Sequence, residues 1–512
     1  MPQIDLWKPR VSESEGAAER LTIFGAFALW LIIVLAWGWT RSAWLDEFFT
    51  AGVTNPAKPF SDLYAARQSD QHPPAYSLML YLWRLLTHVP PNNIFALRVF
   101  GIILSACMVV GALNYWRASG WPGRSIFVVL MLSAPGVFFF PEETRSYFLS
   151  VFGGVYSALF FLRALEAEAS PRFRDGIVGA LGVGLCAMHL MSLAFLCVFA
   201  IFMGVLLIRV RRWAWLRLGL AIGVIVLASV IAFSLAVMLK GVTHAVGSFW
   251  ITRHELLATV VTLPLLLGAP IVGVVVAACV TWRAATGKDG APYLMIAAIL
   301  ASVAVLLAIS VLKPMLVLRY LSAPAAALIP AASILIDRWA SSRALPKWSA
   351  AAAALLCFAL GLPAANEVRF KSDWLTPSRA VNMQTSCEGA VIPFLILNND
   401  PGSPWLAGGG WTEGFFWYAP EHRFVPATPS NITEANGQAC PVRLWIAEQY
   451  LRFIGVEYKA AVREACDGDR RVALEFEGGY LVVDASAHDM ISAWPRAAIQ
   501  CSAIKVAPTG PF

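Results

Sequence analysis

Long apolar runs separated by short polar segments dominate this chain before residue 367. Runs such as Leu21–Trp39, Trp213–Leu239 and Pro292–Leu312 can each cross a hydrocarbon layer of about 30 Å as a helix. The pattern predicts about eleven spans in an α-helical polytopic membrane protein. Their approximate positions are 21–39, 95–115, 125–140, 146–162, 175–188, 190–208, 216–238, 256–281, 291–312, 320–336 and 348–365.

The composition supports a membrane location. Hydrophobic residues make up 58% of the 512 positions and charged residues only 14%, against about 25% in soluble domains. A soluble core cannot bury that much apolar surface, so we expect membrane lipids to cover much of it. The net charge of +7 does not indicate nucleic-acid binding, because the Arg and Lys residues lie mostly in short loops between apolar runs.

Basic residues also predict the orientation of the chain. Loops rich in Arg and Lys alternate with poorer loops, and the basic set should be cytoplasmic. Residues 1–20 are then a cytoplasmic tail, residues 21–366 a transmembrane domain and residues 367–512 a periplasmic domain. The first apolar run lacks a convincing cleavage site, so we interpret it as a retained signal anchor. Short loops, compact size and the absence of eukaryotic retention signals favour a bacterial inner membrane.

Two segments on the predicted outer face are large. Residues 40–93 are amphipathic, and their apolar stretch Ala75–Leu86 is too short to span, so we predict a helix at the membrane interface. Residues 367–512 alternate β-branched and aromatic runs with Gly, Pro and Asn turns, which predicts a small α/β domain. The runs are Ala390–Leu397, Arg471–Phe476 and Tyr480–Val483.

The nine cysteines divide into two groups. Those in apolar runs, which we interpret as core residues, are Cys107, Cys186, Cys197, Cys279 and Cys357. Those in the polar C-terminal segment are Cys387, Cys440, Cys466 and Cys501. An even number there predicts two disulfides in an oxidising compartment, with three pairings open. The alternative is free thiols in a cytoplasmic tail, and the spacing fits no zinc ribbon.

Two polar motifs stand out in the first outer segment. Asp46 and Glu47 are adjacent carboxylates directly after a predicted span, among apolar neighbours. A carboxylate held at the membrane surface can take the proton from an attacking hydroxyl. Further along, Asp70-Gln71-His72-Pro73-Pro74 would hold an acid and a histidine at the start of the interfacial helix. Taken singly, each motif is better explained as a solvated helix start or an ordinary polar turn.

Together with two later segments, these motifs resemble the GT-C superfamily of polyprenyl-phosphate-dependent glycosyltransferases. The resemblance is to the branch with protein O-mannosyltransferases and the aminoarabinose transferase of lipid A, whose first outer loop carries an Asp-Glu-type motif and then Asp-x-His-Pro-Pro. Glu142-Glu143-Thr144-Arg145-Ser146-Tyr147 is similar to the family's Glu-Ala-Arg-x-Tyr segment. Leu318-Arg319-Tyr320 with Pro324 is similar to its late Arg-Tyr-x-x-Pro segment. The four motifs occur in the expected order over about residues 20–340 and do not identify the sugar.

The resemblance implies a role for each motif. Asp46 is the catalytic base that activates the acceptor hydroxyl, with Glu47 as the alternative acid. Glu143 helps to bind acceptor or donor, with the extra acid Glu142 as the alternative. The remaining implied contacts are Arg145, Lys313 and Arg319 on the donor phosphate, Tyr320 and His72 as further contacts, and Asp70 on the substrate. Inversion at the anomeric carbon is also implied by the family.

The chemistry of the implied reaction also favours cationic side chains at the motif around Arg319. The leaving group is a lipid phosphate, whose charge must be stabilised where water is scarce, and Arg offers a planar fork for it. Lys313 and Arg319 flank a short predicted outer turn near the headgroup level, and the alternative for both is snorkelling at the end of a span. We interpret His189 as a packed interfacial residue and the aromatics of the C-terminal segment, Tyr418 among them, as core.

The sequence thus favours a membrane glycosyltransferase that moves a sugar from a polyprenyl-phosphate donor to a hydroxyl of a lipid, glycan or protein acceptor on the periplasmic face. No metal ligands are assigned, and a divalent cation is left open. Two other classes remain: a transporter or flippase of lipid-linked sugars, and a non-catalytic envelope assembly protein. The ionisable residues collect on one predicted face without the paired halves of many transporters, which favours the enzyme.

Overall fold

The chain falls into two units. A computed structural model describes residues 13–43, 45–63, 75–90, 93–226, 228, 257, 290–312, 316, 318–342, 375–395, 418–419, 421–427, 429–447, 466, 471–476 and 479–501. The predicted spans at 256–281, apart from Leu257, and at 348–365 lie outside these residues. The first unit is helical and comprises Met1–Gly38, Pro56–His88 and Phe95–Asn366. The second comprises Trp39–Asn55, Val89–Ile94 and Glu367–Phe512 and contains the described strands.

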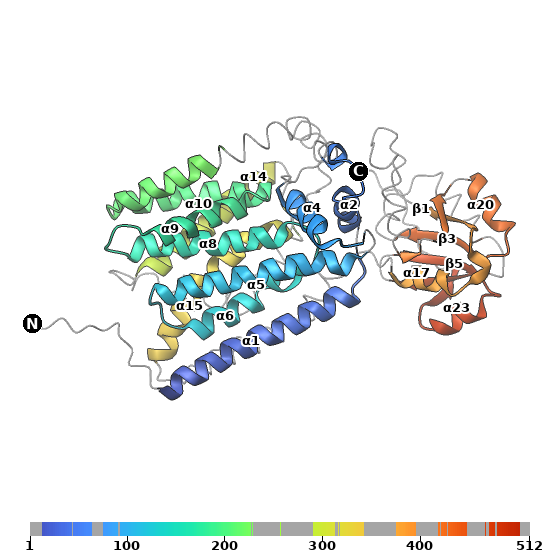
Figure 1. The fold of residues 1–512 in the computed structure, drawn as a ribbon, viewed down its shortest axis with the longest axis horizontal. Coiled ribbons are helices and arrows are strands. Elements are labelled where there is room, and N and C mark those ends of the chain that lie inside the picture. The colour runs from blue at the N-terminus through green and yellow to red at the C-terminus, as the bar shows by residue number, and fades with distance from the viewer. Residues whose placement is uncertain are drawn as a thin grey trace, which may run out of the picture. The chain divides into compact units, whose positions relative to one another are not determined.

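The first unit is a bundle of apolar helices that run side by side (Figure 1). Its described helices are α1 (Glu13–Thr40), α4 (Ala75–Thr87), α5 (Ile94–Ala118), α6 (Arg124–Ser133), α7 (Pro135–Phe139), α8 (Tyr147–Glu166), α9 (Phe173–Cys186), α10 (Leu190–Arg209), a helix at Trp213–Val226, α14 (Ala291–Leu312) and α15 (Ser322–Ser342). Among the described helices, 6 are long and apolar enough to cross a membrane, namely α1, α5, α8, α10, α14 and α15. The chain is therefore a membrane protein, as the hydropathy pattern predicted.

One predicted span, residues 125–140, consists of two helices. Helix α6 ends at Ser133, and α7 begins at Pro135. Ala134 between them is extended, with φ −65° and ψ 128°, because a proline disfavours the helical conformation of the residue before it. A short 3-10 turn, η1 (Phe140–Glu142), then leads toward α8. The break shortens the span and turns the chain into the segment that carries the third motif.

Helix α8 lies at the centre of the helical unit, where it packs against α9, α10 and α15 and buries most of its side chains. Two adjacent glycines make these contacts possible. A Cβ on Gly154 would overlap the carbonyl oxygen of Ala323 in α15, and one on Gly153 would lie 2.5 Å from the backbone nitrogen of Cys186 in α9. Because glycine has no side chain, the backbones of both neighbouring helices can touch that of α8.

The second unit is built on a sheet whose six described strands have the order β2-β1-β3-β5-β4-β6. The strands are β1 (Val391–Leu395), β2 (Arg423–Pro426), β3 (Val442–Ala447), β4 (Arg471–Phe476), β5 (Gly479–Asp484) and β6 (Ala498–Gln500), and the described helices are α2 (Leu45–Val53), α17 (Leu375–Asn382), α20 (Pro429–Asn436) and α23 (His488–Ala493). β1 pairs in parallel with β2 and β3, and the other neighbours are antiparallel. Ile432 of α20 packs with Leu444 and Val482 in the core. The predicted α/β segment is confirmed.

Two disulfides cross-link this unit. They pair Cys387 with Cys440 and Cys466 with Cys501, which selects one of the pairings that the sequence left open. Cys387 follows α17, and Cys440 precedes β3, so the first disulfide joins the α17 region to the sheet. The described cysteines that remain free are Cys107, Cys186 and Cys197, all on helices of the first unit.

Candidate functional site

The first acidic motif lies at the start of α2, in the second unit. Asp46 is in the first turn of this helix, and its side chain lies outside the described residues. The carboxylate of its neighbour Glu47 is fully buried and lies 3.5 Å from the guanidinium of Arg41, which is also buried. A buried carboxylate is stable only when a positive charge compensates it. Glu47 and Arg41 therefore form a structural ion pair.

One face of α2 is buried. Glu47, Thr50, Ala51 and Thr54 are each at most 1% exposed, and their spacing places them on one side of a helix. The hydroxyl of Thr54 donates a hydrogen bond of 2.7 Å to the carbonyl oxygen of Thr50, which satisfies that buried group. The orientation of α2 about its own axis is thus fixed by burial.

The third motif lies between η1 and α8, in the first unit, and is buried. Glu143, Thr144 and Arg145 are 3%, 0% and 6% exposed. Helix α5 approaches this segment closely, because a Cβ on Gly101 would lie 2.7 Å from the carbonyl oxygen of Pro141. Ionisable residues are rarely buried unless other charges compensate them, and such groups are commoner at functional sites than in ordinary cores.

Arg319 of the fourth motif lies against the start of α8. It belongs to the 3-10 turn η4 (Leu318–Leu321), and Ser322 donates a hydrogen bond of 2.7 Å from Oγ to its carbonyl oxygen. The guanidinium lies 5.4 Å from the ring centre of Tyr147 and 5.5 Å from that of Tyr320. Both distances are those of cation–π contacts, in which the ring face attracts the positive charge of the guanidinium.

His189 joins the same group of residues. It directly precedes α10, is 5% exposed, and its ring centre lies 4.8 Å from that of Tyr320 and 5.4 Å from that of Tyr147. We call Tyr147, His189, Arg319 and Tyr320 the α8 cluster. The interpretation of a packed histidine agrees with this burial. Its partners, however, are residues of the third and fourth motifs, and the sequence signal was only a polar residue between two apolar runs.

Helix α4, which follows the second motif, also reaches the start of α8. The ring centre of its buried Tyr76 lies 6.0 Å from that of Phe148. One and two turns further along the same face, α4 buries Leu80 and Arg84. Burial lowers the pKa of Arg84 to about 10, so this guanidinium stays charged at neutral pH. The sequence analysis did not single out Arg84.

The described residues thus bring Arg319 and Tyr320 of the fourth motif onto the end of the third. Predicted site residues outside the described part of the chain are Asp70, His72 and Lys313, together with the side chains of Asp46 and Glu142. Within the described ranges, no group of three or more His, Cys, Asp or Glu residues is placed to hold a metal ion.

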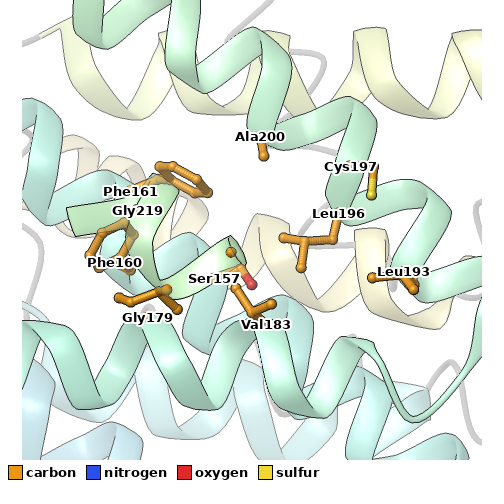
Figure 2. A pocket seen from close by; sticks show the side chains of 12 residues that line it. Ser157, Phe160, Phe161, Gly179, Val183, Leu193, Leu196, Cys197, Ala200 and Gly219 are labelled. Carbon is orange, nitrogen blue, oxygen red and sulfur yellow. The ribbon is translucent and has the colours of Figure 1, made fainter. Parts of the chain in front are cut away.

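An apolar cavity of about 90 Å³ lies between α8, α9, α10 and the helix at Trp213–Val226. Figure 2 shows Phe160 and Phe161 at one side of it and Leu196 and Cys197 at another. The α8 residues that line it begin at Ser157, ten positions beyond Tyr147. Its lining offers no acid, base or cation, so this cavity does not supply the chemistry of the four motifs.

Comparisons with known proteins agree with the fold. No protein-family model and no curated protein sequence matches this chain. Solved structures that do match include ArnT from Cupriavidus metallidurans in the apo state, with 11% identity and a TM-score of 0.54, over 93% of this chain and 99% of that one. ArnT from the same organism bound to undecaprenyl phosphate gives 11% identity and a TM-score of 0.52, over 92% of this chain and 98% of that one. The chain therefore has the fold of these ArnT structures, in agreement with the resemblance that its four motifs indicated.

Proposed function

We propose that this chain is a glycosyltransferase that moves a sugar from a polyprenyl-phosphate donor to an acceptor hydroxyl at the periplasmic face of a bacterial inner membrane. The observation that carries this proposal is the contact of Arg319 with Tyr147. This contact joins residues of two motifs that are more than 150 positions apart, and the resemblance assigns an arginine of each motif to the donor phosphate. The match to an ArnT structure bound to undecaprenyl phosphate supports a lipid phosphate as the leaving group.

The start of α8 suits the phosphate of the donor. The N-terminus of a helix carries partial positive charge and attracts anions. In our proposal Arg145 and Arg319 add full charges at this end of α8, Lys313 adds a third, and Tyr320 is a further contact. A phosphate held by such groups in a dry site is stabilised more strongly than in water, which helps the lipid phosphate to leave.

We assign the base to Asp46 and not to Glu47. The carboxylate of Glu47 is buried against Arg41, so it is occupied within its own unit. Asp46 is the neighbouring acid, and it begins the same helix. Glu143, Glu142, Asp70 and His72 remain as proposed contacts of acceptor and sugar.

The proposed step is a single displacement. The acceptor oxygen forms a bond to the anomeric carbon while the bond from that carbon to the phosphate oxygen breaks. The hydroxyl proton passes to the carboxylate of Asp46, and the electron pair of the broken bond leaves with the polyprenyl phosphate. No oxidation or reduction takes place, and the configuration at the anomeric carbon inverts.

Loss of the base tests the proposal. The purified protein in nanodiscs is given undecaprenyl phosphate that carries a radiolabelled hexose or pentose, with lipids and glycans extracted from cells that lack the protein. We expect label to enter an extracted acceptor and undecaprenyl phosphate to be released. Asp46→Asn should lower the rate about a thousandfold, since it removes the general base.

Asp62→Asn is the matched control, because Asp62 is an exposed acid of the same outer segment and has no proposed role. It should transfer at the wild-type rate. Wild-type turnover by Asp46→Asn would remove the proposed base. Wild-type protein that moves the labelled lipid across the bilayer, with no transfer to any acceptor, would be a flippase.

A further inference from the structure

The acidic segment Trp39–Asn55 folds with the C-terminal residues and not with the helical bundle. Two hydrogen bonds join it to them. The backbone N–H of Ala43 donates to the hydroxyl oxygen of Tyr418 over 2.8 Å, and the backbone N–H of Leu375 donates to Oγ of Ser42 over 3.1 Å. Both attachments lie directly before α2, the helix that Asp46 begins.

A ring contact holds the segment on the other side of Asp46. Phe48 is 1% exposed, and its ring meets that of Tyr418 edge to face, with centres 5.8 Å apart and an interplanar angle of 79°. Tyr418 therefore contacts the chain three residues before Asp46 and two residues after it. A backbone held at both sides of one residue has little freedom to move that residue.

Tyr418 is itself fixed to the sheet domain. Asn382 donates a hydrogen bond of 3.0 Å from its side-chain nitrogen to the carbonyl oxygen of Tyr418. Asn382 ends α17, and Leu375, which binds Ser42, begins it. The disulfide of Cys387 then joins the end of this region to the start of β3. One helix of the C-terminal domain thus supports both attachments of the acidic segment.

We propose that the C-terminal domain positions the catalytic acid, with Tyr418 as the positioning residue; this inference rests on the proposed function. The hydroxyl of Tyr418 sets the backbone before α2, and its ring sets Phe48 within α2. Neither group touches the donor phosphate in our proposal. Tyr418 therefore acts on the rate of the chemical step and not on the affinity for the donor.

Removal of one hydroxyl tests this role. Tyr418→Phe keeps the ring contact with Phe48 and removes the acceptor for the N–H of Ala43. In the full-length protein in nanodiscs, we expect hydrogen exchange in the peptide over residues 39–55 to become about tenfold faster. We also expect kcat for transfer from labelled undecaprenyl-phosphate sugar to fall about tenfold, with the KM for this donor unchanged, since the donor contacts remain.

Tyr480→Phe is the matched control. Tyr480 lies on β5 in the same unit, and its hydroxyl meets Glu475 on the neighbouring strand, away from the acidic segment. This variant should leave both the exchange of residues 39–55 and kcat unchanged. An equal loss of kcat in both variants would indicate general destabilisation and would overturn the positioning role.

The failures of the two proposals are distinguishable. If hydrogen exchange over residues 39–55 stays at the wild-type rate in Tyr418→Phe, the positioning role is overturned. The effect of Asp46→Asn on sugar transfer still tests the proposed function in that case. A rise in donor KM with kcat unchanged overturns it as well. A wild-type protein that transfers no sugar overturns the proposed function. It also overturns the positioning role, because there would then be no catalytic acid to position.

Discussion

At the scale of single residues, the most informative side chain is Arg319. Its guanidinium makes cation–π contacts with Tyr147 and Tyr320, and both of these rings also contact the ring of His189. A lysine ammonium carries the same charge but has neither a flat face to stack nor a fork for two phosphate oxygens. The shape of the arginine therefore matters as well as its charge, and its planar fork suits the donor phosphate of our proposal.

Replacement of Arg319 by lysine keeps the positive charge of the side chain and removes the planar shape of the guanidinium. We expect Arg319→Lys to bind undecaprenyl phosphate about tenfold more weakly, because the loss of the planar fork and the weakening of the cation–π contacts are together worth about 1–2 kcal/mol. Native mass spectrometry or a thermal-shift titration with this lipid measures the affinity. Arg117→Lys, at the exposed end of α5, should bind like the wild type. Equal affinity of Arg319→Lys and wild type would mean that Arg319 only snorkels.

At the scale of elements, the approach of helices to α8 decides where the motifs meet. Gly154 admits the backbone of α15 at Ala323, four residues after Arg319. Gly153 admits the end of α9 at Cys186, three residues before His189. These two glycines of α8 let the backbones of α15 and α9 approach it closely. The turn before α15, which carries Arg319, and the residues after α9, which include His189, can then reach Tyr147. The cluster therefore depends on helix packing as well as on the local turn that carries Arg319 and Tyr320.

One added methyl group tests this packing. Gly154→Ala puts a Cβ where the carbonyl oxygen of Ala323 now lies, so we expect it to cost about 1–3 kcal/mol of stability and to weaken undecaprenyl phosphate binding. Gly25→Ala on α1 meets nothing within 4 Å and should be neutral or slightly stabilising, since alanine favours helices more than glycine does. Melting temperatures in nanodiscs compare the two. A Gly154→Ala protein that melts like the wild type would contradict the packing argument.

At the scale of the whole molecule, the residues of the proposed reaction are divided between the two units. The α8 cluster belongs to the helical unit, and the acidic motif belongs to the unit with the sheet. The proposed base thus depends on the integrity of a domain that contributes no phosphate contact. Two disulfides stabilise that domain by restricting its unfolded chain.

Loss of one disulfide should therefore separate transfer from donor binding. We expect the double variant Cys387→Ser with Cys440→Ser to lose about 2–5 kcal/mol of stability in the C-terminal domain and most of its transfer activity. Binding of undecaprenyl phosphate should persist, because its proposed contacts lie on the helical unit. Cys107→Ala with Cys197→Ala, which removes two free cysteines of that unit, is the control and should keep both properties. Transfer at the wild-type rate without the Cys387–Cys440 disulfide would contradict this dependence.

The sequence by itself determined the membrane class, the positions of the described long helices and the presence of a small α/β domain. It did so because span length and strand composition are local properties. Pro135, which divides one predicted span, is a local signal as well, because proline cannot continue a helix through its own position without breaking a hydrogen bond. The four motifs also predicted the fold correctly, since their order along the chain is a property of the sequence.

Only the tertiary structure decided which of these residues meet. It placed His189 against the fourth motif, paired Glu47 with Arg41, and joined Tyr418 to both sides of Asp46. Such contacts depend on how closely helix backbones approach, on the pairing of strands and on the choice among disulfides. Each of these is settled by packing between separate segments of the chain or by competition among alternatives, and a hydropathy pattern records neither.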